Sequence, residues 1–442
     1  MKNSSLTFLT LMLAFFLTSI SATLYMAVEY DDISLFFTFI LFLLAIFMLD
    51  LGFKIEKKAY IAYFVFVTVM PFYLYSFFLV SGEIYIPGGD AEKYYFRVLD
   101  IASGDDSQLW GRYALFLYIS KLFYQLTNWL FNSESYIHFS FLSSFFATLT
   151  IDPIHKIINN VFDKKIADKV VWFWICTPLL WYLSSGSLRD IYAYFSVLYC
   201  IYFTSCFFSN GKFKYLALSL VFLIYTANIR LDAALFSAIF ISSYALLTHG
   251  KMQFKLIFSV LLVLFVYLVV SKGLVEAFKF SNSFDLSYQV DAYKDLRAES
   301  SSGSFTSKLQ GTALGLLILP FFTFITPFPP PIFFASSFNT ADLLISIFSL
   351  LFLLILPRFF ISSWSNIKNI FILSFLISLF FIIIVLSLTS VGSFRQKLYM
   401  YPIIYALCLS CGFNYFIHKF EVLFISVLST VAVIFVFVRY VY

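Results

Sequence analysis

The sequence predicts an all-α polytopic integral membrane protein, on the evidence of its composition and its pattern of apolar runs. Of 442 residues, 61% are hydrophobic, 22% are aromatic and only 12% are charged. A soluble domain cannot bury so large an apolar share, because too few polar residues remain to cover its surface. Apolar stretches of about 20 residues, the length that crosses a bilayer, recur along the whole chain. We therefore expect 1–442 to form a single membrane domain.

About 13 apolar runs are predicted to cross the membrane, and the first is predicted to stay attached. Its apolar stretch exceeds the hydrophobic part of a secretory signal, so we expect a retained anchor. The predicted spans are 6–27, 33–50, 60–80, 135–152, 169–185, 190–208, 214–229, 231–248, 255–271, 341–356, 369–389, 398–416 and 420–438.

Lysine predicts the orientation. With the N-terminus in the cytoplasm, every short cytoplasmic loop carries a Lys or Arg, including 52–59 and 153–169, and 14 of the 21 lysines lie in cytoplasmic segments. This is the positive-inside pattern. The net charge of +5 therefore reports topology, and we exclude nucleic acid as a partner.

Two enlarged loops are predicted on the opposite, extracytoplasmic side. The first, 81–134, contains a short helix that starts at Asp90 and an amphipathic aromatic helix at 112–131, which suits the membrane interface. One face of the short helix is predicted to consist of Ala91, Tyr94, Tyr95, Val98 and Ile101.

The second enlarged loop, 272–340, begins with a solvated, Ser-rich stretch and ends in a proline-broken segment. Five prolines interrupt 311–340, so we expect a re-entrant segment covered by protein or facing a water-filled cavity. The stretch before it is either a lid over a cavity or an ordinary solvated loop.

Arginine, unlike lysine, is concentrated on the outer side. Of eight arginines, only Arg358 lies in a predicted cytoplasmic loop, whereas Arg97 and Arg297 lie in the two enlarged loops. Positive charge outside opposes the topological bias, so its presence needs a reason. A guanidinium binds phosphate bidentately; pairing with carboxylates or lipid headgroups is the alternative. We expect at least two of three arginines at outer span ends to bind an anionic substrate: Arg189, Arg230 and Arg395.

Asp90 and His138 are the candidate catalytic residues. Asp90 follows a Gly-Gly turn just outside the membrane, where a carboxylate can accept a proton from a sugar hydroxyl; helix capping is the alternative. His138 is the histidine nearest the outer face, with a structural role as its alternative. Tyr94 and Tyr95 are candidate rings for binding sugar, or else interfacial anchors.

The sequence indicates neither a metal site nor a cofactor. All five cysteines fall inside predicted spans, so no disulfide framework is expected. No phosphate-binding Gly-rich loop, metalloprotease motif or internal repeat is present.

In its architecture and in several short motifs the chain resembles the O-antigen polymerases (Wzy type) and the wider exopolysaccharide repeat-unit polymerases. The likeness covers the architecture of nearly the whole chain and four short motifs, GGDAEKYY at 88–95, SGSLRD at 185–190, ITPFPPP at 325–331 and VGSFRQKLYMYP at 391–402.

The resemblance implies a GT-C-like fold in the bacterial inner membrane and metal-independent glycosyl transfer at the periplasmic face. The donor and the acceptor would both be undecaprenyl-pyrophosphate-linked glycans, and a chain-length regulator is an expected partner. Arg189 and Arg395 would hold the pyrophosphates, with Arg230 assisting. Asp90 is the first choice for handling the acceptor hydroxyl, and His138 is the second.

Two other functions remain open from the residues. One is a GT-C glycosyltransferase that uses a polyprenyl-monophosphate sugar. The other is a flippase for lipid-linked oligosaccharides, although a transporter is expected to carry ionisable residues deep in its spans, whereas here they cluster at span ends.

Overall fold

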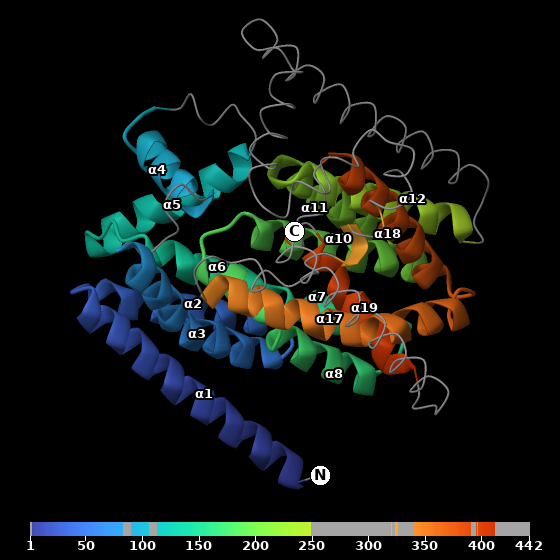
Figure 1. Cartoon of the computed structure of the whole chain (residues 1–442), viewed down its shortest axis with the longest axis horizontal. Coiled ribbons are helices and arrows are strands. Elements are labelled where there is room, and N and C mark those ends of the chain that lie inside the picture. Colours follow the sequence, from blue (N-terminus) through green and yellow to red (C-terminus); the bar gives the residue numbers. More distant parts are fainter. Residues whose placement is uncertain are drawn as a thin grey trace, which may run out of the picture.

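The computed structural model (Figure 1) describes residues 2–82, 90–105, 113–248, 320, 323–325, 340–389, 395 and 397–411. The described residues form helices joined by short turns, and no β-strand occurs among them, which confirms the predicted all-α class. In chain order the elements are α1 (Lys2–Glu29), α2 (Ser34–Phe53), α3 (Lys58–Ser81), α4 (Asp90–Ala102), α5 (Ala114–Phe131), α6 (Ile137–Leu149), α7 (Ile151–Val161), α8 (Lys164–Ile175), α9 (Pro178–Ser185), α10 (Asp190–Asn210), α11 (Phe213–Ile229), α12 (Leu231–Leu247), α17 (Thr340–Ser365), α18 (Ile370–Thr389), η4 (Leu398–Met400) and α19 (Tyr401–Ser410).

Six of the described helical segments are long and apolar enough to cross a membrane, or seven if α8 and α9 count as one bent span. The other apolar helices, α11, α12, α18 and the segment from η4 through α19, offer shorter apolar segments of 10 to 17 residues. This arrangement is that expected of a helical membrane protein. The predicted spans 255–271 and 420–438 lie outside the described residues.

Helix α1 buries small and polar residues, together with Met26, against the protein and turns several leucines outward. Ser19 and Thr23 are fully buried where α1 packs against α2 and α3, whereas Leu13 and Leu17 are both 54% exposed. In water this pattern would be unfavourable, but in lipid small and polar residues favour helix contacts while leucine faces the acyl chains. The packing of α1 therefore supports a membrane environment.

The central span is formed by α6 and α7, which continue into one another through Thr150. Of the residues in its apolar window, 89% are buried, compared with 22% in α1. The predicted cytoplasmic loop 153–169 is wrong in extent, because α7 and α8 occupy nearly all of it and only Phe162 and Asp163 separate them. The physical reason is that isoleucines at 154, 157 and 158 extend the buried face of the span.

The span formed by α8 and α9 bends by 56° at Pro178. Proline lacks a backbone N–H and disfavours helical geometry in the residue before it, and Thr177 is accordingly extended. Trp181 Nε1 donates to the carbonyl of Ile175 at 2.7 Å, satisfying one acceptor at the break. The bend leads the chain through 186–189 into α10.

The first enlarged loop contains both predicted helices. In α4 the buried residues are Tyr94, Val98 and Ile101, with Ala91 and Tyr95 half-buried, so the predicted face packs inward. The segment predicted at 112–131 forms α5, which packs against α4, α6 and α11. Most of the second loop, 272–340, lies outside the described residues.

Candidate functional site

The arginine-bearing junctions meet at one end of the helix bundle. Helices α10 and α11 are antiparallel neighbours, so the start of α10 after Arg189 and the end of α11 before Arg230 lie at the same end. Arg395 reaches this end from the segment between α18 and η4. The lysine-bearing ends, such as Lys212 after α10, lie about 30 Å away because α10 has 21 residues.

Arg230 is buried between two aspartates. Its Nε donates to both carboxylate oxygens of Asp232, at 2.9 and 3.1 Å, and its Nη1 contacts Asp190 Oδ1. The side chains of Arg230 and Asp190 are only 8% and 4% exposed. Buried charges are tolerated only when paired, so Arg230 and Asp190 depend on each other. This contact joins α10 to the junction between α11 and α12.

Arg395 links the same aspartate to the first enlarged loop. Its Nη1 lies 3.8 Å from Asp190 Oδ2, and its Nη2 lies 3.1 Å from Asp90 Oδ2 at the start of α4. Its backbone carbonyl accepts a hydrogen bond from Tyr194 on α10. The Asp90 side chain is 46% exposed and the Arg395 side chain 27%, so this pair faces solvent.

Arg189 is held by aromatic rings. Its guanidinium carbon lies 3.4 Å from the ring centroid of Tyr113 and 5.9 Å from that of Tyr94. Among the described residues, no carboxylate lies within ion-pair distance of Arg189. Burial raises the pKa of Tyr94 to about 12, despite the opposing effect of Arg189, so this phenol stays neutral.

These contacts define an arginine–aspartate cluster of three guanidinium groups and three carboxylates. Its formal charge is zero, so an anion that enters must displace a carboxylate or use Arg189, which faces no carboxylate among the described residues. The members differ in accessibility: Arg230 and Asp190 are buried, whereas Asp90 and Arg395 are partly exposed. The cluster consists of Arg189, Arg230, Arg395, Asp90, Asp190 and Asp232.

The other predicted binding residues are not brought into this cluster. Tyr95 points toward the linker between α5 and α6, where its hydroxyl donates to the carbonyl of Glu134 at 2.7 Å. Arg97 is half exposed on α4, and no ion pair joins it to the cluster among the described residues. Arg297 lies outside the described residues.

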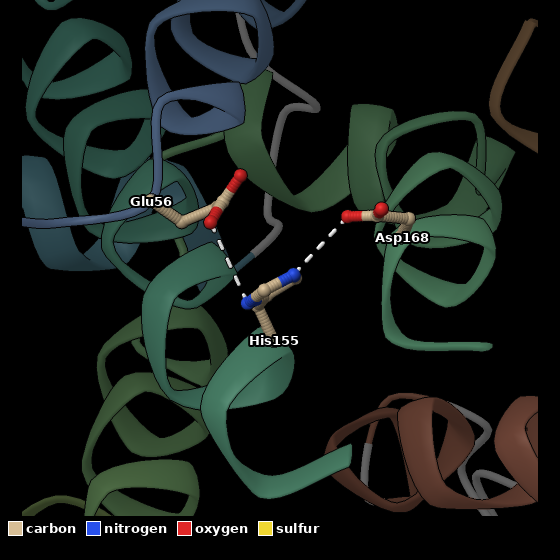
Figure 2. Close-up of side chains that lie close together, drawn as sticks. All are labelled: Glu56, His155 and Asp168. Atoms are coloured by element: carbon tan, nitrogen blue, oxygen red, sulfur yellow. Dashed lines mark hydrogen bonds and ion pairs between the residues drawn. The ribbon is translucent and has the colours of Figure 1, made fainter. Parts of the chain in front are cut away.

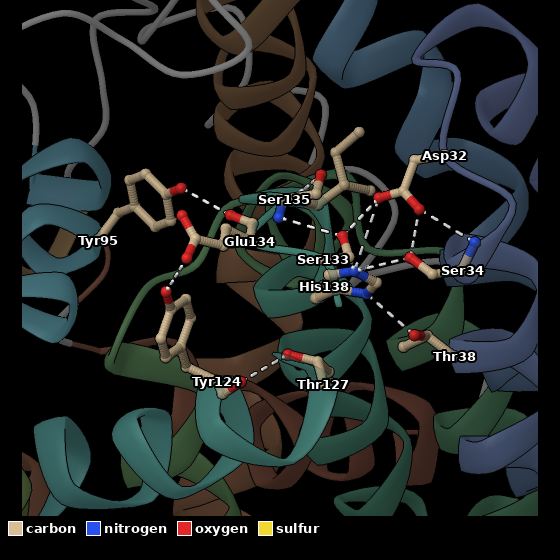
Figure 3. A network of polar contacts seen from close by, with 11 residues as sticks. Asp32, Ser34, Thr38, Tyr95, Tyr124, Thr127, Ser133, Glu134, Ser135 and His138 are labelled. Atoms are coloured by element: carbon tan, nitrogen blue, oxygen red, sulfur yellow. Dashed lines mark hydrogen bonds and ion pairs between the residues drawn. The ribbon is translucent and has the colours of Figure 1, made fainter. Parts of the chain in front are cut away.

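His138 lies in a separate polar network, shown in Figure 3 with Tyr95 and Glu134 beside it. It is 1% exposed. Its Nδ1 lies 2.9 Å from Thr38 Oγ1, and its Nε2 lies 2.9 Å from Ser133 Oγ and 3.1 Å from Ser34 Oγ. Both ring nitrogens are thus occupied by hydroxyl groups. These contacts join α6 to α2 and to the linker before α6.

Asp32 completes that network from the linker between α1 and α2. Its carboxylate accepts hydrogen bonds from Ser133 Oγ at 2.7 Å and from the backbone N–H of Ser34 at 3.0 Å. Burial by itself raises the pKa of Asp32, but these hydrogen bonds and the nearby His138 lower it below its usual value.

Two features of this end were missed from the sequence. The first is that Asp190 serves Arg230 and Arg395 rather than the adjacent Arg189. The second is Lys397, which is 3% exposed and donates to the carbonyls of Thr323 and Phe324. Burial lowers the pKa of Lys397 to about 7. The only sequence signal was the proximity of Lys397 to Arg395 in one short motif.

Potential metal ligands occur elsewhere. Within the described part of the chain, the group of three side chains able to share an ion is Glu56, His155 and Asp168, at the lysine-rich end. In the arginine–aspartate cluster the carboxylates of Asp90, Asp190 and Asp232 all face guanidinium groups.

Comparison with known proteins adds no assignment, since the chain matches no family model, no curated protein and no solved structure. No relative therefore supplies a role for any member of the cluster.

Proposed function

We propose that this protein is a membrane glycosyltransferase that polymerises undecaprenyl-pyrophosphate-linked oligosaccharide repeat units at the periplasmic face of the bacterial inner membrane. The observation that supports the proposal is the meeting of Arg189, Arg230 and Arg395 with Asp90 at the end of the bundle opposite Lys212 and the lysine-rich segment around α7 and α8. The three arginines come from three separate helix junctions. Arginines that only anchored their own helix ends would not need to lie close together.

The partly exposed pair is the place where a pyrophosphate enters. Asp90 holds Arg395 by one contact of 3.1 Å, and both side chains reach solvent. Exposed ion pairs contribute only about 0–1 kcal/mol, so a phosphate can replace the carboxylate at little cost. A phosphate also offers the guanidinium two oxygens at once, which strengthens the exchange.

Arg189 provides a second guanidinium, which holds no carboxylate in the described part of the chain. Its place over Tyr113 and Tyr94 leaves it partly desolvated. Arg189 and Arg395 together neutralise the two phosphates of the leaving group. Arg230 acts indirectly, because it fixes Asp190, which in turn contacts Arg395.

When a phosphate replaces Asp90 at Arg395, the Asp90 carboxylate also becomes free to act as the base. The displaced Asp90 carboxylate remains beside the bound pyrophosphate and takes the proton of the acceptor hydroxyl. The hydroxyl oxygen forms a bond to the anomeric carbon of the donor glycan, and the bond from that carbon to the phosphate oxygen breaks. The electron pair leaves with the lipid pyrophosphate, whose charge the guanidinium groups stabilise.

The positions of other residues suggest where the sugar rings and the lipid tails bind and which side of the membrane the cluster faces. Tyr94 offers a neutral phenol beside the anion, which suits contact with a sugar ring. The outward apolar faces of the spans suit the polyprenyl tails. The lysine-rich ends face the cytoplasm by the positive-inside rule, together with the N-terminus, so the cluster faces the periplasm.

The surface glycan of a deletion strain tests the proposed reaction. A polymerase mutant should carry single repeat units attached to the core, whereas loss of all repeat units would indicate a flippase or an early transferase. A glycan that lacks one sugar would indicate a transferase with a polyprenyl-monophosphate donor.

Variants introduced into the deletion strain test the arginines. Arg395→Lys and Arg189→Lys should reduce long-chain polymer at least about tenfold, because an ammonium does not reproduce the bidentate guanidinium fork. Arg358→Lys on α17 is the matched control and should restore normal polymer. Full polymer in both cluster variants, at equal protein levels in the membrane, would contradict pyrophosphate binding at this cluster.

A further inference from the structure

A second group of ionisable side chains lies at the lysine-rich end, away from the arginine–aspartate cluster. Glu56 comes from the turn between α2 and α3, His155 from α7 and Asp168 from α8 (Figure 2). Figure 2 shows the two carboxylates on opposite sides of the imidazole, each directed at one ring nitrogen. His155 Nε2 lies 3.1 Å from Asp168 Oδ1, and Nδ1 lies 3.4 Å from Glu56 Oε2.

This group already binds a cation, which is the ammonium of Lys58. Lys58 Nζ contacts Asp168 Oδ1 and lies 3.4 Å from Glu56 Oε1. The same Asp168 oxygen faces both the ammonium and His155 Nε2. Two carboxylates thus hold one tethered positive charge, and the imidazole contacts both of these carboxylates. With a neutral imidazole, the formal charge of Glu56, Asp168 and Lys58 together is −1. A divalent cation that took the place of the ammonium would neutralise both carboxylates.

The donor atoms are held in place by the surrounding structure. The backbone N–H of Glu56 donates to Asp152 Oδ1 at 3.1 Å, and Asp152 is itself paired with Lys156 at 2.7 Å. Ile55 is buried beside Glu56 and anchors the turn. The Glu56 and Asp168 side chains are 24% and 38% exposed, so an ion can reach them from solvent.

We propose that Glu56, His155 and Asp168 bind a divalent transition metal ion of the Zn²⁺ class, in exchange for the ammonium of Lys58. One potential ligand atom from each residue lies within 4.8 Å of the others. Ligands about 2.1 Å from a tetrahedral ion lie about 3.4 Å apart, close to the separation of His155 Nε2 from Asp168 Oδ1. An imidazole ligand selects transition metals over Mg²⁺ and Ca²⁺, which take oxygen donors.

The bound ion would fasten the turn between α2 and α3 to α7 and α8. This inference does not rest on the proposed glycosyl transfer, because the two groups lie at opposite ends of the bundle.

Zn²⁺ titration of the full-length protein in detergent, after treatment with a chelator, tests the site by calorimetry. Wild type should bind one more equivalent than His155→Ala or Glu56→Gln, and Asp100→Asn, an exposed carboxylate on α4, should match wild type. Lys58→Met should raise the affinity for Zn²⁺ about tenfold or more, because it removes the competing charge. Melting curves before addition of metal establish that each variant is folded.

Two results would overturn the proposal. One is equal Zn²⁺ stoichiometry in wild type, Lys58→Met and folded Glu56→Gln, which would leave the group as an ion-pair network. The other is a site that binds Mg²⁺ as tightly as Zn²⁺, which would exclude the imidazole as a selecting ligand.

Discussion

Replacing Asp90 with asparagine separates its proposed role as a base from a role in stability. Its side chain is 46% exposed and contacts Arg395 through a single pair of atoms 3.1 Å apart. An exposed ion pair contributes about 0–1 kcal/mol, and an acid in the first turn of a helix about 0.3–1 kcal/mol. Asp90→Asn should therefore lower the free energy of unfolding by no more than about 2 kcal/mol, leaving the protein folded in the membrane.

The effect on activity should be far larger. Loss of a general base typically slows a reaction about 10²- to 10⁴-fold. Polymer formed by the purified protein from lipid-linked repeat units measures this rate. Glu92→Gln is the matched control, because it removes the other acid from the first turn of α4 and leaves the contact with Arg395 in place. Asp90→Asn with a rate within a few fold of wild type would refute the assignment of Asp90 as base and leave it as a helix-end charge.

The remaining predictions concern stability and topology. Arg230→Met should lower the free energy of unfolding by about 3–5 kcal/mol, since it leaves the buried Asp190 with only the 3.8 Å contact to Arg395. Arg230→Met with Asp190→Asn should recover part of that loss in denaturant titrations, and strictly additive losses would show that the two residues are not coupled. In a cysteine-free background, Ser103→Cys should react with an impermeant thiol reagent in intact cells and Lys212→Cys only after permeabilisation, and the reverse result would invert the orientation. Because the folded pKa of Asp32 lies below its usual value of 3.8, its stabilising effect is present above that pH and is lost as the pH falls through the lowered pKa. Melting temperatures should therefore drop more steeply below about pH 4 in wild type than in Asp32→Asn, and parallel curves would contradict the hydrogen bonds from Ser133 and Ser34.

Local periodicity predicted the elements of the first enlarged loop. The face of α4 was readable because Tyr94, Val98 and Ile101 recur at helical spacing, and burial follows that spacing. The extent of α7 was misjudged because the lysines of 153–169, among them Lys156, indicated a cytoplasmic loop. In the structure Lys156 pairs with Asp152 and His155 pairs with Asp168 of α8, so the helix continues through this stretch.

The ionisable residues pair with residues that are distant in sequence. Asp90 and Arg395 are 305 residues apart, and His138 and Thr38 are 100 apart. Periodicity shows which side of a helix faces inward, but the choice of partner depends on how the helices cross. A prediction based on sequence neighbours would pair Asp190 with Arg189, whereas packing directs it toward Arg230 and Arg395.

The sequence by itself determined that the chain is helical and suited to a membrane, and it separated most of the lysines from Arg189, Arg230 and Arg395, because composition and charge placement are properties of the chain alone. Only the tertiary structure decided how these charges are used. It buries Arg230 between two aspartates, leaves Arg395 and Asp90 partly exposed, places His138 among hydroxyl groups, and brings Glu56, His155 and Asp168 together next to Lys58. The physical reason is that the energy of a buried or half-buried charge depends on its neighbours in space, and those neighbours come from helices far apart in sequence.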